Sequence, residues 1–399
     1  MSGEDVATND AAGTIDWGSL PVESFDVAFD EAERRCRAAD DADRLFDLRM
    51  LRAKLAAGLP GDRPATLSDV PSDRRGELEA VYRESAREAG MMLLARDDLP
   101  AAWPYFQAIG ETGPVRDALD ARPTVDGYDE RQQELTQIAL FEMAHPRRGV
   151  EMLLAGSGIC NTVTAIDQVM PQLGPADRAD CGAVVIDELH GQLLAAVNRE
   201  LQTRDPLHRA STTLAESIDA DPTLLDNGAY HADVSHLASA VRFARSLDRD
   251  SSALAKAIDL CRYGERLDET LVFAGEPPFE DLYVASRHFL TALADGTSES
   301  GELGRQYFRD RLASEPADGH RTLVALVLTD LLMRTGRVDE AVQIARAELA
   351  DQGEQFGFSF AEVCREAGRL DVLEEWGRER SDPIAMLAGR FGQMGRVDD

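Results

Sequence analysis

The chain of 399 residues has almost no lysine: Lys54 and Lys256 are the only two, and the other 40 basic residues are arginines. Aspartate and glutamate total 73, so the formal net charge is -31. Proteins that bind nucleic acids normally present a basic face, so the excess of acidic over basic residues argues against a nucleic-acid-binding protein. The most compact basic cluster is the stretch "HPRRG" at 145–149. We therefore expect no nucleic-acid partner.

This excess of carboxylates over lysine resembles the composition of proteins from salt-in halophiles, such as haloarchaea. In about 1 M salt the Debye length falls to about 3 Å, so neighbouring surface carboxylates barely repel one another. They keep the chain soluble, and arginine pairs with them through two parallel hydrogen bonds, which lysine cannot do. The resemblance implies a halophilic protein.

Cysteine and long apolar runs are also scarce. The five cysteines are scattered and form no CxxC pair, which is typical of a reduced cytosolic protein. The acidic start lacks the apolar core of a signal peptide. The longest apolar run, Thr322 to Met333, contains Asp330 and is too short to span a bilayer. These features predict a cytoplasmic protein without a membrane partner.

Alternating apolar and polar residues, the pattern of strands, are absent, whereas apolar residues recur at spacings of three and four. This periodicity predicts an all-α protein, with breaks where Gly, Pro and Asp cluster. We expect a disordered acidic leader (1–20), an N-terminal helical repeat region (21–125), an irregular central helical region (126–300) and C-terminal repeats (301–399).

Two parts of the chain carry a repeated helix-turn-helix pattern. The first has the small pair Ala89–Gly90 on one helix, then Ala102 and Phe106 on the next, and Pro114 at the end. The second has "TGRVDEA" around Gly336, a copy around Gly368 that lies 32 residues later, and the start of a third at Gly395. Glycine permits the tight turn between such helices.

These motifs resemble the tetratricopeptide repeat, whose period is about 34 residues. The tryptophan of the first helix is missing, because Ala86 occupies its place. The resemblance implies an α-α superhelix that holds a peptide or partner protein in a concave groove. We expect arginine or aromatic side chains in that groove, such as Trp103, Tyr105 and Arg365. It does not reach the central region, which matches no family that we recognise.

The stretch "YHADVSH" in the central region has the residue types of a metal site. His231, Asp233 and His236 could bind zinc, manganese or iron. The two histidines are five residues apart, so one would lie in the loop before a helix. The alternative interpretation makes Asp233 the N-cap of a helix whose buried stripe includes Leu237 and Val241.

Further ligands for such a site could come from Glu188 and His190, or from His145. The zincin signature requires a second histidine four residues after the first, and position 194 is leucine. A solvated acidic helix face explains Glu188 equally well.

A second candidate is an anion site. Gly156 and Gly158 precede a predicted helix, whose backbone amides could face an anion, and Arg147 and Arg148 lie just upstream. Neither a third glycine of a dinucleotide motif nor a P-loop lysine follows. A glycine turn between two helices is the alternative.

The sequence therefore predicts a noncatalytic interaction scaffold that binds a peptide or partner protein and needs no cofactor. The alternative is a metal-dependent enzyme or metal-binding module built around His231, Asp233 and His236.

Overall fold

The structure, a computed structural model, is entirely helical, which confirms the all-α prediction. It describes residues 15–68, 70–123, 127, 129–295, 298–316, 319–351 and 357–392, and these contain no β-strand. Residues 1–14 of the predicted leader and Gly395 of the third repeat lie outside the described ranges. The chain divides into two compact units, residues 1–156 and 157–399. The division falls within the region predicted at 126–300.

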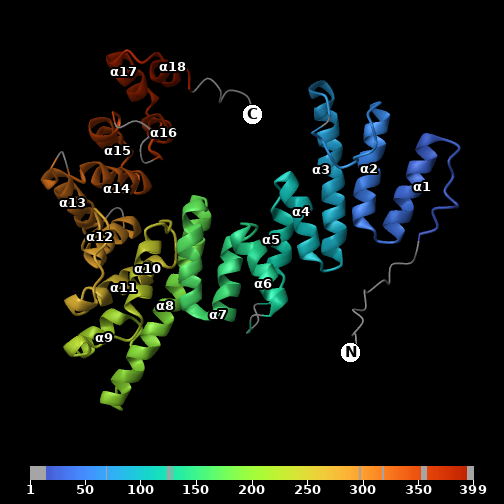
Figure 1. Cartoon of the computed structure of the whole chain (residues 1–399). Helices are drawn as coiled ribbons and strands as arrows, with labels where there is room; N and C mark the ends of the chain where they lie inside the picture. The colour runs from blue at the N-terminus through green and yellow to red at the C-terminus, as the bar shows by residue number, and fades with distance from the viewer. Residues whose placement is uncertain are drawn as a thin grey trace. The chain divides into compact units, whose positions relative to one another are not determined.

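Unit 1 is built from helices that pack side by side in chain order, as the contacts of α1 with α2, α2 with α3 and α3 with α4 show (Figure 1). Its elements are α1 (Phe25–Ala38), α2 (Ala42–Ala56), α3 (Ser72–Ala95), α4 (Leu99–Ile109), α5 (Gly113–Asp120), α6 (Glu130–Thr136) and the π-helical turn η1 (Gln137–Phe141). Helix α7 (Pro146–Val169) begins in unit 1 and crosses the division at residue 156.

The first predicted repeat is a helical hairpin made of α3 and α4. Ala89, Leu93, Ala102 and Phe106 are buried where the two helices cross. A Cβ at Gly90 would lie 2.6 Å from the ring of Phe106, so the glycine makes room for the aromatic ring. The helical hairpin predicted over this stretch is confirmed.

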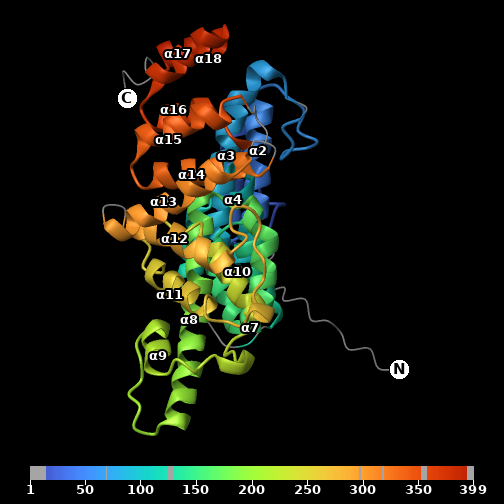
Figure 2. The same ribbon diagram turned by 90° about the vertical axis from the view of Figure 1, so that its left-hand side faces the viewer.

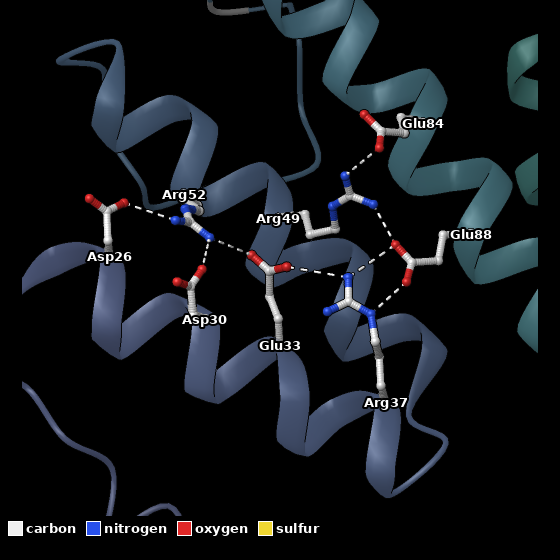
Figure 3. Close-up of polar contacts among 8 residues, drawn as sticks. All are labelled: Asp26, Asp30, Glu33, Arg37, Arg49, Arg52, Glu84 and Glu88. Atoms are coloured by element: carbon white, nitrogen blue, oxygen red, sulfur yellow. Dashed lines mark hydrogen bonds and ion pairs between the residues drawn. The ribbon is translucent and has the colours of Figure 1, made fainter.

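A ladder of ion pairs joins α1, α2 and α3 on the surface of unit 1 (Figure 3). Arg52 of α2 bonds to Asp26 at 2.8 Å, to Asp30 at 2.6 Å and to Glu33 at 3.2 Å, all on α1. The ladder continues through Arg37 and Arg49, which both pair with Glu88 of α3. Hydrogen bonds from Arg37 are the main reason that the pKa of Glu88 lies below its usual value.

We expect Arg52→Gln to lower the free energy of unfolding by about 1 kcal/mol in dilute buffer, because exposed ion pairs contribute little individually but three carboxylates lose their shared cation. The loss should shrink in about 1 M salt, where the Debye length is about 3 Å. Thermal unfolding at both salt concentrations measures this. Arg74→Gln is the control, since the ion pair of Arg74 among the described residues is a 3.9 Å contact with Asp73. An equal loss at both concentrations would contradict the electrostatic explanation.

Unit 2 begins with the rest of α7, and in its later part each helix packs against its neighbours in the chain (Figure 2). Its further α-helices are α8 (Pro175–Arg204), α9 (Leu214–Ala220), α10 (Val234–Ala244), α11 (Leu254–Gly264), α12 (Leu282–Ala294), α13 (Glu299–Ser314), α14 (Arg321–Arg334), α15 (Val338–Ile344), α16 (Phe360–Glu366), α17 (Leu370–Arg380) and α18 (Pro383–Phe391). Shorter turns are η2 (Met170–Gln172), η3 (Asp226–Gly228), η4 (Glu269–Leu271) and η5 (Ala345–Leu349).

The predicted glycine turns of the C-terminal repeats have the expected geometry. Gly336 has φ +75° and Gly368 has φ +68°, in the left-handed region that favours glycine. The residue after each glycine donates its N–H to a carbonyl of the preceding helix: Arg337 to Leu332 at 2.8 Å and Arg369 to Cys364 at 2.7 Å. This closing pattern is the Schellman motif, which satisfies the last carbonyls of a helix.

Within the described residues, one helical segment, Pro146–Gln172, is long and apolar enough to cross a membrane by length and composition. Several of its side chains, including Val150, Val163 and Ile166, are buried in the protein. A core helix meets the same criterion, so this one segment is weak support for a membrane span.

Candidate functional site

Four helices of unit 2 line an open cavity of about 820 Å³. Helix α10 packs against α8 and α12, and α12 packs against α14. The lining residues come from η2, α8, α10, α12, α14 and the adjoining loops: Met170, Pro171, Pro175, Arg178, Arg242, Arg245, Ser246, Asp248, Phe279, Phe289, Leu326, Val327, Asp330 and Arg334. Four arginines in one cavity are notable in a chain whose net charge is -31.

Arg245, which directly follows α10, is one of these arginines. Its Cζ lies 4.1 Å from the centroid of the Phe279 ring, so the guanidinium rests on an aromatic face. Its Nε is buried and has no hydrogen-bond partner among the residues that the structure describes. Burial, helped by the charge of Arg242, lowers the pKa of Arg245 to about 10, while Glu276 opposes the shift. The group therefore stays protonated at neutral pH, with a donor available.

Arg334 of α14 also rests on an aromatic ring. Its Cζ lies 5.4 Å from the centroid of the Phe289 ring. Its Nη1 donates to the carbonyl oxygen of Arg245 at 2.8 Å and to Asp330 at 3.1 Å. Arg334 therefore fixes the backbone that carries Arg245, while its own charge is paired with a carboxylate.

The other two arginines keep part of their bonding capacity. Arg178 donates through Nη2 to the carbonyl of Pro171 at 3.3 Å, and its buried Nε has no partner among the described residues. Arg242 donates to the hydroxyl of Ser239 at 2.7 Å and makes a 3.3 Å pair with Asp167. With Asp248 and Asp330 as the lining carboxylates, the cavity walls carry two more positive charges than negative ones.

A second cavity of about 350 Å³ shares Arg242 and Arg245 with the first. Its remaining lining residues are Ser235, Ala238, Ser239, Phe273, Ala274, Gly275, Glu276 and Leu282. The arginine pair thus lies between two hollows. Arg242 is exposed and Arg245 is half-buried, and guanidinium groups that keep free donors can bind carboxylate or phosphate oxygens through charge-assisted hydrogen bonds.

Two of the three residues of the predicted metal site, His231 and Asp233, have other partners, and His236 lies half-buried in the first turn of α10. His231 is held by two groups: its Nδ1 lies 2.9 Å from the hydroxyl of Tyr263, and its Nε2 lies 2.7 Å from Oε2 of Glu200. Asp233 caps α10, with its carboxylate accepting from the N–H of Ser235 at 2.8 Å. The capped-helix interpretation is confirmed, and Leu237 and Val241 are buried as expected.

The additional ligands considered for a metal site are also engaged. Nε2 of His190 lies 2.8 Å from Asp259 in a buried pair. His145 belongs to unit 1, where its Nε2 lies 2.9 Å from Asp120. Glu188 accepts a hydrogen bond from Gln192 on the same helix. Among the described residues, no group of three or more His, Cys, Asp or Glu side chains could hold a metal ion. The metal site stays a prediction without geometric support.

The residues of the predicted anion site near Gly156 belong partly to unit 1 and partly to unit 2. Arg147 and Arg148 both pair with Glu151, at 3.2 and 2.8 Å. Gly156 ends unit 1, and Gly158, with φ +73°, interrupts α7 in unit 2. The glycine turn between two helical segments is confirmed, and anion binding there stays a prediction.

The expectation that Trp103 lines a groove is wrong. Trp103 is 4% exposed in the core of unit 1, and its Nε1 donates to Glu142 at 2.6 Å. Tyr105 donates its hydroxyl hydrogen to Asp43 and packs against Phe46. Arg365 is exposed and pairs with Glu362. The aromatic residues of α4 therefore stabilise the helix packing of unit 1.

Sequence reasoning missed the arginine-lined cavity. Its arginines lie at 178, 242, 245 and 334, so no local motif joins them. The sequence does carry a signal of this site at Arg245. This residue follows the apolar stripe of a helix, in "VRFARSL". A charged side chain so close to the core is unusual and indicates a specific role.

Comparisons with known proteins give no relative: no protein-family model, curated protein or solved structure matches the chain. The likeness to tetratricopeptide repeats therefore remains a resemblance carried by the hairpins described above.

Proposed function

We propose that this protein is a noncatalytic binding protein, and that unit 2 holds an acidic segment of a partner protein in the arginine-lined cavity. The observation that carries the proposal is Arg245: a charged guanidinium, stacked on Phe279, with a buried N–H donor that no described residue accepts from. An anionic ligand in the cavity could accept charge-assisted hydrogen bonds from this guanidinium.

The size of the cavity supports a ligand with several groups. Its volume of about 820 Å³ lies in the upper part of the range of ligand pockets. The four arginines come from three helices and a helix end, so their donors approach the cavity from different sides. A segment with more than one carboxylate could contact several of them, which a single small anion could not.

The chemistry of the lining favours binding over catalysis. General acid-base catalysis near neutral pH uses groups that gain and lose protons there, whereas arginine stays charged. The described lining residues contain neither histidine nor cysteine, and Asp330 is paired with Arg334. The walls therefore present fixed positive charges, which suit the binding of an acidic partner segment.

The test is a titration of the full chain with a fluorescent peptide in which glutamate alternates with glycine. We expect Arg245→Gln to weaken binding about 10- to 100-fold, because a hydrogen bond to a charged group contributes about 1.5–3 kcal/mol. Arg262→Gln is the matched control: Arg262 is an exposed arginine of α11, outside both cavities. Circular dichroism checks that each variant folds.

Two results would contradict the proposal. One is wild-type binding no tighter than that of a peptide with glutamine in place of glutamate. The other is an equal loss of affinity in the Arg245 and Arg262 variants, which would indicate nonspecific attraction to surface arginines.

A further inference from the structure

Helix α14 has two apolar faces, one buried in the core and the other only partly buried. Val324, Leu328, Leu331 and Leu332 are buried in the core of unit 2. Two further apolar residues, Leu326 and Val327, are half-buried and line the arginine-rich cavity. The second face explains why the sequence from Thr322 to Met333 is apolar almost all round, a pattern expected of a fully buried helix.

The apolar and charged parts of the cavity alternate along this helix. Val327, Asp330 and Arg334 lie three and four residues apart, so they share one face of α14. Met170, Pro171 and Phe289 add further apolar side chains to the lining. A ligand that reaches the arginines must therefore also lie against apolar side chains.

The adjoining cavity repeats this combination on the other side of Arg242 and Arg245. Its walls include Ala238, Leu282 and the ring of Phe273, which is 48% exposed although it is aromatic. The arginine pair is thus flanked by apolar surface in both hollows. A ligand with acidic side chains alone would leave that apolar surface exposed to water.

We infer that the partner segment carries large apolar side chains next to its acidic ones, so that a carboxylate binds Arg245 while an apolar neighbour packs against Leu326 and Val327. This inference rests on the proposed function, because it specifies the segment that the cavity binds. The positive charge of Arg245 determines where the carboxylate binds. The half-buried side chains of Leu326 and Val327 determine where the apolar side chain packs. Burial of one such side chain corresponds to an affinity gain of about tenfold or more.

The experiment compares two peptides of equal length and charge, one alternating glutamate with glycine and the other alternating glutamate with leucine. We expect the leucine peptide to bind the wild-type chain about tenfold more tightly or better. In Val327→Ser the affinity for the leucine peptide should fall several-fold, while that for the glycine peptide stays unchanged. Leu303→Ser is the control, since Leu303 is 60% exposed on α13 and lines neither cavity.

The outcomes separate the inference from the function on which it rests. Equal binding of the two peptides, with loss of both in Arg245→Gln, overturns the inference and leaves the proposed function standing. Binding of neither peptide overturns both. Tighter binding of the leucine peptide that neither Val327→Ser nor Arg245→Gln reduces would place it elsewhere on the protein, and also overturns the inference.

Discussion

Replacing Asp259 by alanine is expected to lower the free energy of unfolding of unit 2 by about 3–5 kcal/mol, because the change leaves buried groups without their charged partner. Asp259 accepts from Nε2 of His190 at 2.8 Å and from the backbone N–H groups of Leu214 and Ala215 at 2.6 and 3.0 Å. It thereby joins α8, α9 and α11. Chemical denaturation measures the loss, and Asp187→Ala is the control, with its exposed pair to Lys256.

Asp259 also predicts how stability depends on pH. Burial by itself would raise the pKa of Asp259, but the hydrogen bonds from His190, Leu214 and Ala215 outweigh it and lower the pKa below the usual value. Because the folded-state pKa is depressed, the contribution is fully present above the unfolded value of about 3.9 and is lost as the pH falls through the folded value. Asp259→Asn should therefore show a flatter loss of stability in acid than the wild type. Identical acid profiles, or a stability loss no larger than that of Asp187→Ala, would contradict this role.

Gly275→Ala is expected to damage both the fold and the binding site, although it removes no charged group. A Cβ at Gly275 would lie 1.9 Å from the carbonyl oxygen of Phe279, so the turn between the two residues must shift. Phe279 supports the guanidinium of Arg245, and the shift would move that support. We expect a loss of about 1–3 kcal/mol in stability and about tenfold in affinity for the leucine–glutamate peptide.

Gly191→Ala is the matched control for that change. Gly191 lies within α8, and a Cβ added there would meet no neighbouring side chain or helix within 4 Å, so alanine fits. There the substitution should stabilise the helix by about 1 kcal/mol and leave binding unchanged. Unaltered affinity in Gly275→Ala would show that the position of Phe279 does not matter for the site.

Local features of the fold could be predicted because their causes lie within a few residues. The turns at Gly336 and Gly368 require a positive φ, and the sequence around them indicates where each helix ends. The cap at Asp233 depends on an N–H only two residues away. The hairpin that contains Gly90 and Phe106 could be predicted because its two helices are adjacent in the sequence.

The candidate site could not be predicted, because its parts come together only through tertiary packing. The partners of His231 are Glu200 and Tyr263, which are 31 and 32 residues away, so the local pattern of ligand types was misleading. The cavity joins Arg178 to Arg334 across more than 150 residues of sequence, and no spacing rule connects them. Besides the position of Arg245, the apolar character of α14 on all sides gave a signal, which became interpretable once one face was seen to line the cavity.

The central claim is that the arginine-lined cavity of unit 2 binds an acidic, partly apolar segment, and photocrosslinking tests it most directly. A leucine–glutamate peptide with a photoreactive leucine analogue is bound to the full chain, irradiated, and the crosslinked residues are identified by mass spectrometry. We predict crosslinks at lining residues such as Met170, Leu326 and Val327, which an excess of unlabelled peptide abolishes and Arg245→Gln strongly reduces. Crosslinks confined to unit 1 or to exposed residues such as Leu303 of α13, or crosslinks that persist in Arg245→Gln, would contradict it.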